Sequence, residues 1–238
     1  MSKIVIKNLG LIQGGRWLFR HLDLEVAAGD FLAVVGPSGT GKSSFLACLS
    51  GIRRPTEGTV HYQSNRSDKS RNSNARRAPR DFRPHIGILF QNLLLTEGRT
   101  VLDNVLCGRL YRLPFFRTLF GFPNPFREEA FHLLYDLGLE GCCHRFVREI
   151  SGGERQRVAL ARTLFQKPSI LLADEPVAQL DAYLTGRVLG ILKLQTTQHQ
   201  KTVFCVLHSQ ELVARFADSV LSFNPCHPEK WKLRSIKT

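Results

Sequence analysis

The amino-acid sequence predicts an α/β fold in which short buried strands alternate with helices. Three observations support this class: nearly continuous apolar runs, helical patterns between them, and a glycine-rich turn directly after one run. Short, continuous apolar runs suit parallel strands that are covered on both faces. The runs are Phe31–Val35, Ile86–Phe90, Ser169–Ala173 and Thr202–Leu207.

Two N-terminal segments have a different pattern. Residues 4–9 (IVIKNL) and Leu22–Val26 alternate apolar with polar side chains, as half-buried antiparallel strands do. They predict an antiparallel β subdomain.

Helical patterns fill the rest of the chain, which we interpret as a single domain over residues 1–238. The core is expected at about 1–92 and 166–225, an inserted helical lobe at about 93–165, and an irregular tail at 224–238. The individual helices are predicted at Lys42–Leu49, Arg127–Leu137, Glu154–Phe165 and Ala182–Leu194.

Composition limits the location and the partners of the chain. No stretch approaches the ~20 apolar residues that span a bilayer. The N-terminus lacks the features of a signal peptide, so we expect the protein to begin near Met1 and to stay in the cytoplasm. The formal charge of +13 is compatible with three kinds of partner: nucleic acid, an anionic membrane surface or a phosphorylated ligand. Much of this charge falls in Ser64–Arg83, which we interpret as a solvated basic loop.

A phosphate-binding loop follows the first apolar run. The sequence GPSGTGKS matches G-x-x-x-x-G-K-[ST] in the required strand–loop–helix context. Its glycines let backbone N–H groups point at phosphate oxygens, Lys42 is expected to reach the β- and γ-phosphates, and Ser43 to ligate Mg²⁺. The predicted binding residues are Gly36, Pro37, Ser38, Gly39, Thr40, Gly41, Lys42, Ser43 and Ser44.

Two adjacent carboxylates end another apolar run. Asp174 is placed to hold Mg²⁺ through water, and Glu175 to orient and polarise the attacking water. Gly36, Gln91, the Asp174–Glu175 pair and His208 each follow a predicted strand. Because ligands of open parallel sheets bind at the carboxyl ends of strands, these groups are expected at one edge.

A third motif, Ile150–Arg162 (ISGGERQRVALAR), begins with an S-x-x-E capping box formed by Ser151 and Glu154. The box predicts a helix that starts at the serine. Gly152 and Gly153 leave its first turn bare, so a phosphate can approach the N–H groups.

Together these motifs resemble the ABC ATPase family, whose signature is LSGGQ followed by a basic helix, and the likeness covers nearly the whole sequence. It implies a P-loop NTPase (RecA-like) core with an antiparallel β subdomain and an inserted α-helical signature lobe. By the same resemblance, Gln91 is similar to the Q-loop glutamine, Asp181 to the D-loop aspartate and His208 to the switch histidine.

The resemblance implies ATP and Mg²⁺ as ligands and a head-to-tail homodimer. Each ATP would lie between Gly36–Ser43 of one subunit and the signature of the other. The implied residues are Glu175, His208 and Gln91 for catalysis, Ser151, Gly152, Gly153, Glu154 and Asp181 for ATP, and Ser43, Gln91 and Asp174 for Mg²⁺.

Some positions depart from the family pattern. Gln13 stands where an aromatic residue usually stacks on adenine, and Trp17 is four residues further on. The signature starts with Ile150 and ends with Glu154 where leucine and glutamine are common. The D-loop reads VAQLD, without the usual small residue before its leucine.

The resemblance also suggests a transporter and a cargo. The segment Asn104–Leu139 is similar to that of phosphonate-importer ATPases, which implies phosphonate or phosphite-type oxyanions. The implied partners are integral membrane permease subunits and a periplasmic or surface solute-binding protein, with the chain peripheral at the cytoplasmic face of the inner membrane. An aromatic cluster is predicted to receive the permease's coupling helix: Phe115, Phe116, Phe120 and Phe122.

Two alternatives remain open at this point. One is a soluble ABC ATPase that acts on nucleic acid or ribosomes, which the charge favours although no nucleic-acid motif is present, so no specific nucleic-acid partner is expected. The other is an efflux or lipoprotein-release ATPase with the same chemistry.

Overall fold

The structure is a computed structural model that describes residues 2–64, 85–113 and 121–236. It divides into two compact units. Unit 1 comprises Met1–Ile88, Ser169–Glu175 and Gly190–Thr238, and unit 2 comprises Leu89–Pro168 and Pro176–Leu189. Nearly all of the predicted basic loop and three phenylalanines of the predicted aromatic cluster, Phe115, Phe116 and Phe120, lie outside the described residues.

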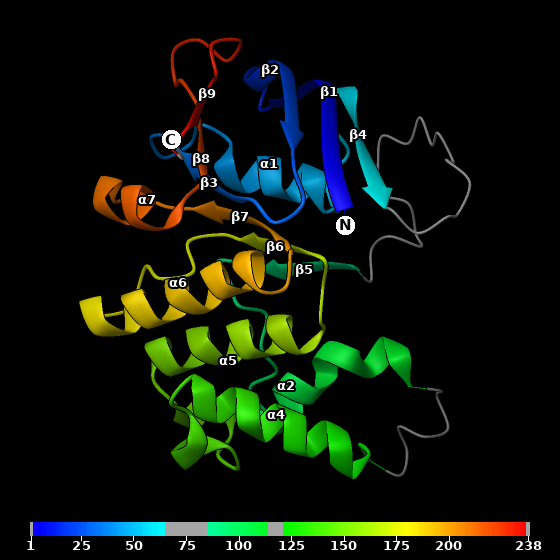
Figure 1. Cartoon of the computed structure of the whole chain (residues 1–238), viewed down its shortest axis with the longest axis vertical. Coiled ribbons are helices and arrows are strands. Elements are labelled where there is room, and N and C mark those ends of the chain that lie inside the picture. The colour runs from blue at the N-terminus through cyan, green and yellow to red at the C-terminus, as the bar shows by residue number, and fades with distance from the viewer. Residues whose placement is uncertain (1, 65–84, 114–120, 237–238) are drawn as a thin grey trace. The chain divides into compact units, whose positions relative to one another are not determined.

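A six-stranded sheet with the order β5-β6-β7-β3-β8-β9 forms the centre of unit 1 (Figure 1). β3 pairs in parallel with β7 and β8, and β6 pairs in parallel with β7. All residues of β6 and β7 are buried, which confirms that the continuous apolar runs are covered strands. The strands are β3 (Phe31–Val35), β5 (Ile86–Leu89), β6 (Ile170–Ala173), β7 (Thr202–Val206), β8 (Ser219–Ser222) and β9 (Lys232–Ser235).

A second, antiparallel sheet in unit 1 has the order β2-β1-β4, with β1 at Ser2–Gln13, β2 at Arg16–Val26 and β4 at Glu57–Ser64. The predicted antiparallel subdomain is confirmed, but β2 is longer than expected. The cause is a two-residue turn, Gly14-Gly15, whose positive φ angles of 58° and 76° let pairing begin at once between Gln13 and Arg16.

Helix α1 (Lys42–Leu49) packs through Phe45 against three other phenylalanine rings of unit 1. The Phe45 ring of α1 lies 6.0 Å from that of Phe19 in β2, 6.3 Å from that of Phe204 in β7 and 5.6 Å from that of Phe223. These rings meet edge to face, the arrangement that aromatic quadrupoles favour. The contacts fix the start of α1, and with it the end of the glycine-rich loop.

The C-terminal segment of unit 1 corrects one expectation. Residues 224–238 were predicted to be irregular, but Lys232–Ser235 form β9, which pairs antiparallel with β8. The Trp231 indole N–H donates to the carbonyl of His21 (3.2 Å) and fastens the segment. Exposed basic side chains on β9 suit an edge strand, because charge discourages pairing with another chain.

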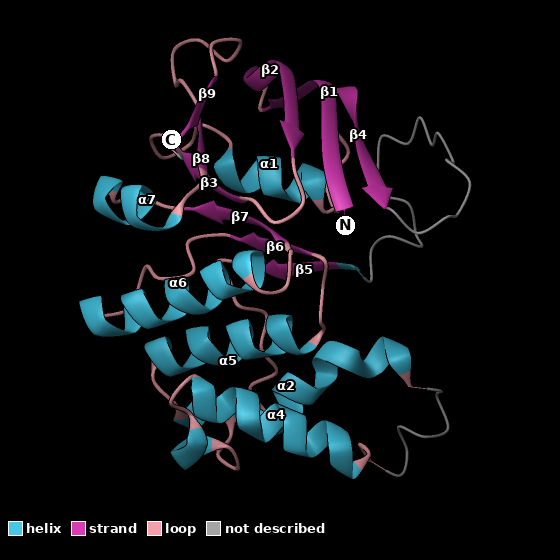
Figure 2. Cartoon of the chain, viewed as in Figure 1, coloured by secondary structure: helices cyan, strands magenta, loops and turns pink. Residues whose placement is uncertain are grey.

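Unit 2 is mainly helical, as predicted (Figure 2). Helix α4 begins before the predicted Arg127 because Pro125 occupies its first turn, where a missing N–H costs nothing. It ends before Gly138, which has a φ of 65°. The helices are α2 (Val101–Leu106), η2 (Cys107–Arg112), α4 (Asn124–Asp136), η3 (Glu140–Cys142), η4 (Val147–Glu149) and α5 (Gly152–Phe165), and α6 (Ala182–Thr197) starts here and continues into unit 1.

One buried cation joins three segments of unit 2. The Arg109 side chain is 3% exposed, and its two terminal nitrogens each donate to a carboxylate oxygen of Glu129 at 2.6 Å. Its guanidinium lies 4.0 Å from the centre of the Phe165 ring, and Lys167 forms a second ion pair with Glu129 (2.6 Å). The bidentate pair therefore connects η2 with α4 and the end of α5.

In the described ranges, every helix is too short or too polar to cross a membrane.

Candidate nucleotide site

The predicted phosphate loop lies between β3 and α1 in unit 1. Gly41 is the N-cap of α1 with a φ of 96°, and a Cβ there would lie 2.9 Å from Cβ of Leu18. Glycine is thus required both by the backbone conformation and by the close approach of β2. The loop brings several backbone N–H groups to the positive end of α1, the arrangement that binds phosphates.

The lysine of the loop is buried and held by its own backbone. Its Nζ donates to the carbonyl of Gly36 (2.8 Å) and to that of Pro37 (2.9 Å). Thr40 Oγ1 also donates to the Pro37 carbonyl (2.9 Å) and braces the turn. The Lys42 ammonium therefore lies across the loop, where it can exchange carbonyl oxygens for phosphate oxygens.

Asp174 follows β6 and lies beside the start of α1. The Ser43 hydroxyl donates a hydrogen bond to its carboxylate, and Lys42, Glu175 and His208 are close enough to act on its charge. Burial raises the pKa of Asp174 above its ordinary value, and its buried Oδ1 has no hydrogen-bond partner among the described residues. A buried carboxylate oxygen without a donor, next to a serine hydroxyl, suits a hard divalent cation.

Glu175 and His208 form a contact at the same edge. His208 Nε2 lies 2.7 Å from Glu175 Oε1. Glu175 has a φ of 52°, the left-handed region that non-glycine residues enter at a cost of ~1–3 kcal/mol. Such strain persists only where surrounding contacts enforce it, and it concentrates at functional sites.

The expected convergence at one sheet edge is confirmed for three of the four strands. Gly36 follows β3, Asp174 and Glu175 follow β6, and His208 follows β7, which lies between those two strands in the sheet. Gln91 follows β5 but belongs to unit 2. Its predicted role as a Mg²⁺ ligand stays a prediction.

The signature motif opens α5 as the capping box predicts. Ser151 Oγ accepts from the Glu154 N–H (3.3 Å), while the Ser151 N–H donates to Glu154 Oε2 (2.7 Å). These bonds with Ser151 lower the pKa of Glu154. Glu154 thus keeps the helix start well defined despite two glycines after the cap.

The D-loop packs on those glycines within unit 2. A Cβ on Gly152 would lie 2.9 Å from Gln179 Oε1, and one on Gly153 would lie 3.4 Å from Leu180 Cδ2. Asp181 accepts from the Leu184 N–H (2.8 Å) and caps α6. Gln179, which sequence reasoning noted only as a departure, is therefore a neighbour of the signature.

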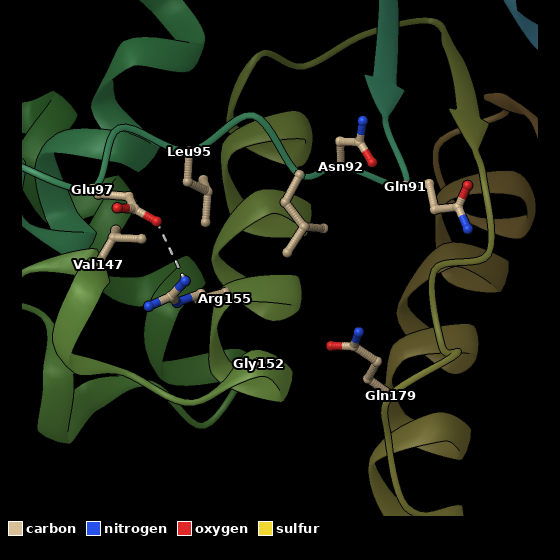
Figure 3. A pocket seen from close by; sticks show the side chains of 9 residues that line it. Gln91, Asn92, Leu95, Glu97, Val147, Gly152, Arg155 and Gln179 are labelled. Atoms are coloured by element: carbon tan, nitrogen blue, oxygen red, sulfur yellow. Dashed lines mark ion pairs between the residues drawn. The ribbon is translucent and has the colours of Figure 1, made fainter.

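A pocket of about 300 Å³ in unit 2 lies between the segment after β5 and the signature (Figure 3). Arg155 and Glu97 form an ion pair across it at 3.6 Å. Gln91 and Gln179 both line it, so it connects two predicted site residues of this unit. The other lining residues are Asn92, Leu93, Leu95, Val147 and Gly152.

Arg162 is a residue that sequence reasoning did not single out. Its guanidinium donates to the carbonyls of Leu93 and Leu94, both at 2.6 Å. Leu93 and Leu94 have φ angles of 50° and 48°. Two successive strained residues need external support, and Arg162 of α5 supplies it.

Gln13 and Trp17 lie on opposite faces of the β1–β2 hairpin. Gln13 pairs with Arg16, whereas Trp17 pairs with Ile12, one position along. The Trp17 ring lies 4.4 Å from the Arg20 guanidinium. Gln13 Oε1 accepts from Arg53 Nη1 (2.9 Å) and from Ser44 Oγ (3.4 Å), so Gln13, not Trp17, faces α1.

Comparison with known proteins agrees with this geometry. The family model described as ABC transporter matches residues 19–178, which include the phosphate loop, the signature and both site carboxylates. The chain belongs to the ABC transporter family. As an ABC ATPase it binds and hydrolyses ATP.

Curated ABC relatives cover most of the chain. The phosphonates import ATP-binding protein PhnC of Treponema denticola is 33% identical over 92% of this chain and 85% of its own length. The phosphate-import ATP-binding protein PhnC of Mycolicibacterium smegmatis is 39% identical over 83% and 74%. The L-cystine transport system ATP-binding protein TcyN of Escherichia coli is 35% identical over 93% and 86%.

Solved ABC structures share the fold. The dimeric, post-hydrolysis state of the ATP-binding cassette MJ0796 with ADP and phosphate has a TM-score of 0.83 at 26% identity, with 99% of both chains covered. A further dimeric structure of MJ0796 has a TM-score of 0.82 at 27% identity, again with 99% coverage of both chains. The predicted P-loop fold is thereby confirmed.

Proposed function

We propose that this chain is the motor subunit of an ABC importer and that it works as a head-to-tail homodimer at the cytoplasmic face of the membrane. The observation that carries the proposal is the contact between His208 and Glu175 beside the phosphate loop. A carboxylate held by a histidine, next to a serine–aspartate pair and a buried lysine, suits hydrolysis of a phosphoanhydride.

Substrate binding begins at the phosphate loop. The triphosphate accepts hydrogen bonds from the backbone N–H groups at the start of α1, and Lys42 turns from the carbonyls of Gly36 and Pro37 to the β- and γ-phosphates. The ammonium is already buried and close to its new partners, so little reorganisation is needed.

Ser43 and Asp174 fit a Mg²⁺ ion, and Gln91 is the predicted third contributor. The fit rests on the unpartnered Oδ1 of Asp174 and on the adjacent Ser43 hydroxyl. A bound ion would supply positive charge that stabilises the phosphate oxygens.

Glu175 positions the attacking water. Its carboxylate accepts a hydrogen bond from the water and polarises it toward the γ-phosphorus. His208 holds the carboxylate in place at 2.7 Å and can donate to a γ-phosphate oxygen when ATP is bound. The left-handed backbone of Glu175 directs the side chain from the strand end, so the strain serves orientation.

The second half of each site comes from the partner subunit in this proposal. Ser151 and the bare first turn of α5 offer N–H groups to the γ-phosphate bound by the other subunit. Asp181, which caps α6, stays with the D-loop beside that turn. The dimeric cassette MJ0796 supports this arrangement.

The importer assignment and its cargo rest on the relatives. Two relatives are named for phosphonate and phosphate import, which supports a phosphonate or phosphite-type oxyanion, while a third is named for L-cystine. The pocket around Leu95 and Arg155 is the proposed site for a permease helix, and a solute-binding protein delivers the cargo. The test uses membrane vesicles that contain this chain, the permease and the solute-binding protein. Stimulation of their ATPase activity by methylphosphonate supports this cargo, and stimulation by L-cystine instead contradicts it.

The experiment that tests the motor assignment compares Glu175→Gln with the wild type. The variant should retain ATP binding and lose at least ~100-fold in turnover, because the water loses its polarising carboxylate. Glu229→Gln is the matched control, since the exposed Glu229 also contacts a histidine, His227 (3.5 Å), and is not one of the predicted site residues. Equal turnover in both variants would contradict the assignment.

A further inference from the structure

Gln13, which stands where the resembled family usually has an aromatic residue, contacts the phosphate-binding segment at Ser44. Gln13 ends β1 at the Gly14-Gly15 turn. Its side chain accepts a hydrogen bond from Ser44, the third residue of α1. Ser43 faces Asp174 on the catalytic side. Because successive helical residues point in directions about 100° apart, Ser44 lies on a different side of α1 from that carboxylate.

Arg53 completes a cluster on this other side. Its Nη1 donates to Gln13 Oε1 at 2.9 Å and to Ser44 Oγ at 3.3 Å, and Ser44 Oγ in turn donates to Gln13 Oε1 at 3.4 Å. The three side chains form a closed triangle of hydrogen bonds. The hydrogen bonds of Nη1 therefore hold the Arg53 guanidinium by one edge of its plane.

The electrostatics of the cluster leave Arg53 able to attract a ligand. Both acceptors of Nη1 are neutral oxygens, an amide and a hydroxyl, so they orient the guanidinium without neutralising its charge. Arg53 is half-buried, and the turn next to Gln13 is open, because a Cβ on Gly14 or Gly15 would meet none of the described residues within 4 Å. A flat cation held by its edge beside open space is a surface on which a purine ring can stack.

We infer that Arg53, oriented by Gln13 and Ser44, is the stacking platform for the base of ATP. Phosphates bound by Gly36–Ser43 direct the γ end toward Glu175 and His208, so the nucleoside leaves on the Ser44 side, where the guanidinium lies. Trp17 is excluded from this role because it lies on the other face of the hairpin, against Arg20. The inference rests on the ATP site proposed above.

The test measures the affinity of the full chain for two ligands, Mg-ATP and Mg-tripolyphosphate, by calorimetry. Arg53→Ala should weaken the affinity for Mg-ATP about 10-fold, which is within the range of a lost base stack. It should leave the affinity for Mg-tripolyphosphate unchanged. Arg53→Lys should behave like the alanine variant, since it keeps the charge but not the plane. Gln13→Tyr added to Arg53→Ala should recover ATP affinity by restoring an aromatic platform.

Three results would overturn the inference. If Arg53→Ala weakens the affinity for both ligands equally, Arg53 contacts the phosphates. If Arg53→Ala leaves ATP affinity unchanged, Arg53 is not part of the site. Full ATP affinity in Arg53→Lys would show that charge alone suffices. Trp17→Ala is the matched control and should leave ATP affinity unchanged. Loss of tripolyphosphate binding in Lys42→Ala checks the phosphate loop separately, so failure of the loop is distinguishable from failure of the platform.

Discussion

At the scale of single residues, the hydrogen bonds of the two units differ in how far apart along the chain their partners lie. The Ser151–Glu154 box joins residues within one helical turn, so the motif alone predicted its hydrogen bonds. The Arg53–Gln13 contact spans 40 positions and the Arg162–Leu93 contact spans 69. Neither follows from any local pattern, because the fold alone brings such residues together.

The Arg109–Glu129 pair gives a prediction at this scale. The hydrogen bonds from Arg109 lower the pKa of Glu129 from an ordinary value of 4.5 to about 2, with Lys167 adding to the effect. A carboxyl whose pKa is depressed by folding contributes stability above its unfolded pKa, and that contribution is lost as the pH falls through the folded value.

Glu129→Gln should therefore lower the melting temperature at pH 7, and the difference from the wild type should shrink between about pH 4.5 and pH 2. Thermal melts followed by circular dichroism across this range measure it. Glu128→Gln, at the exposed neighbouring position of α4, should have little effect at any pH. A difference that stays constant with pH would show that the ion pair is not the source of stability.

At the scale of elements, the apolar runs predicted the strands well because parallel strands buried on both faces leave a simple signature. The predicted tail was wrong at Lys232–Ser235, since an exposed edge strand carries no apolar alternation. The length of β2 was also missed, because the glycine turn that sets its register contributes no hydrophobic pattern. The shared edge of the polar residues after β3, β6 and β7 was predicted correctly from their positions directly after apolar runs.

The segment after β5 gives the prediction at this scale. Arg162→Ala removes both donors to the carbonyls of Leu93 and Leu94, and the two left-handed residues then lose their support. Hydrogen exchange in the peptide that contains Gln91–Leu95 should become about 10-fold faster, because local opening costs less.

Arg187→Ala on α6 is a suitable control. The Arg187 side chain donates a hydrogen bond to the carbonyl of Tyr135 in α4 and to no part of the Leu93–Leu94 segment in the described ranges. Unchanged exchange around Leu93 in Arg162→Ala would contradict the support role. Exchange that rises across all of unit 2 would indicate a loss of α5 packing instead.

At the scale of the whole molecule, the sequence motifs divide between the two units. The phosphate loop, Asp174, Glu175 and His208 belong to unit 1, while Gln91, the Ser151–Glu154 signature and Asp181 belong to unit 2. The proposed dimer brings the signature of one chain to the phosphate loop of the other. A single sequence cannot establish that pairing, because the contacts lie between chains.

The most direct test of this central claim mixes two inactive variants. Lys42→Ala removes the phosphate contact, and Ser151→Arg blocks the first turn of α5 and should leave the fold intact, at the cost of a cap worth about 1 kcal/mol. Each variant alone should fail to hydrolyse ATP, because both sites of its homodimer are defective.

In a head-to-tail heterodimer of the two, one site combines the intact loop of one chain with the intact signature of the other. Single-turnover ATP hydrolysis of a 1:1 mixture should therefore recover to roughly a quarter of the wild-type level, since about half of the dimers are mixed and each has one good site. If the mixture stays as inactive as its components, the phosphate loop and the signature do not act across a dimer interface, and the proposed arrangement is wrong.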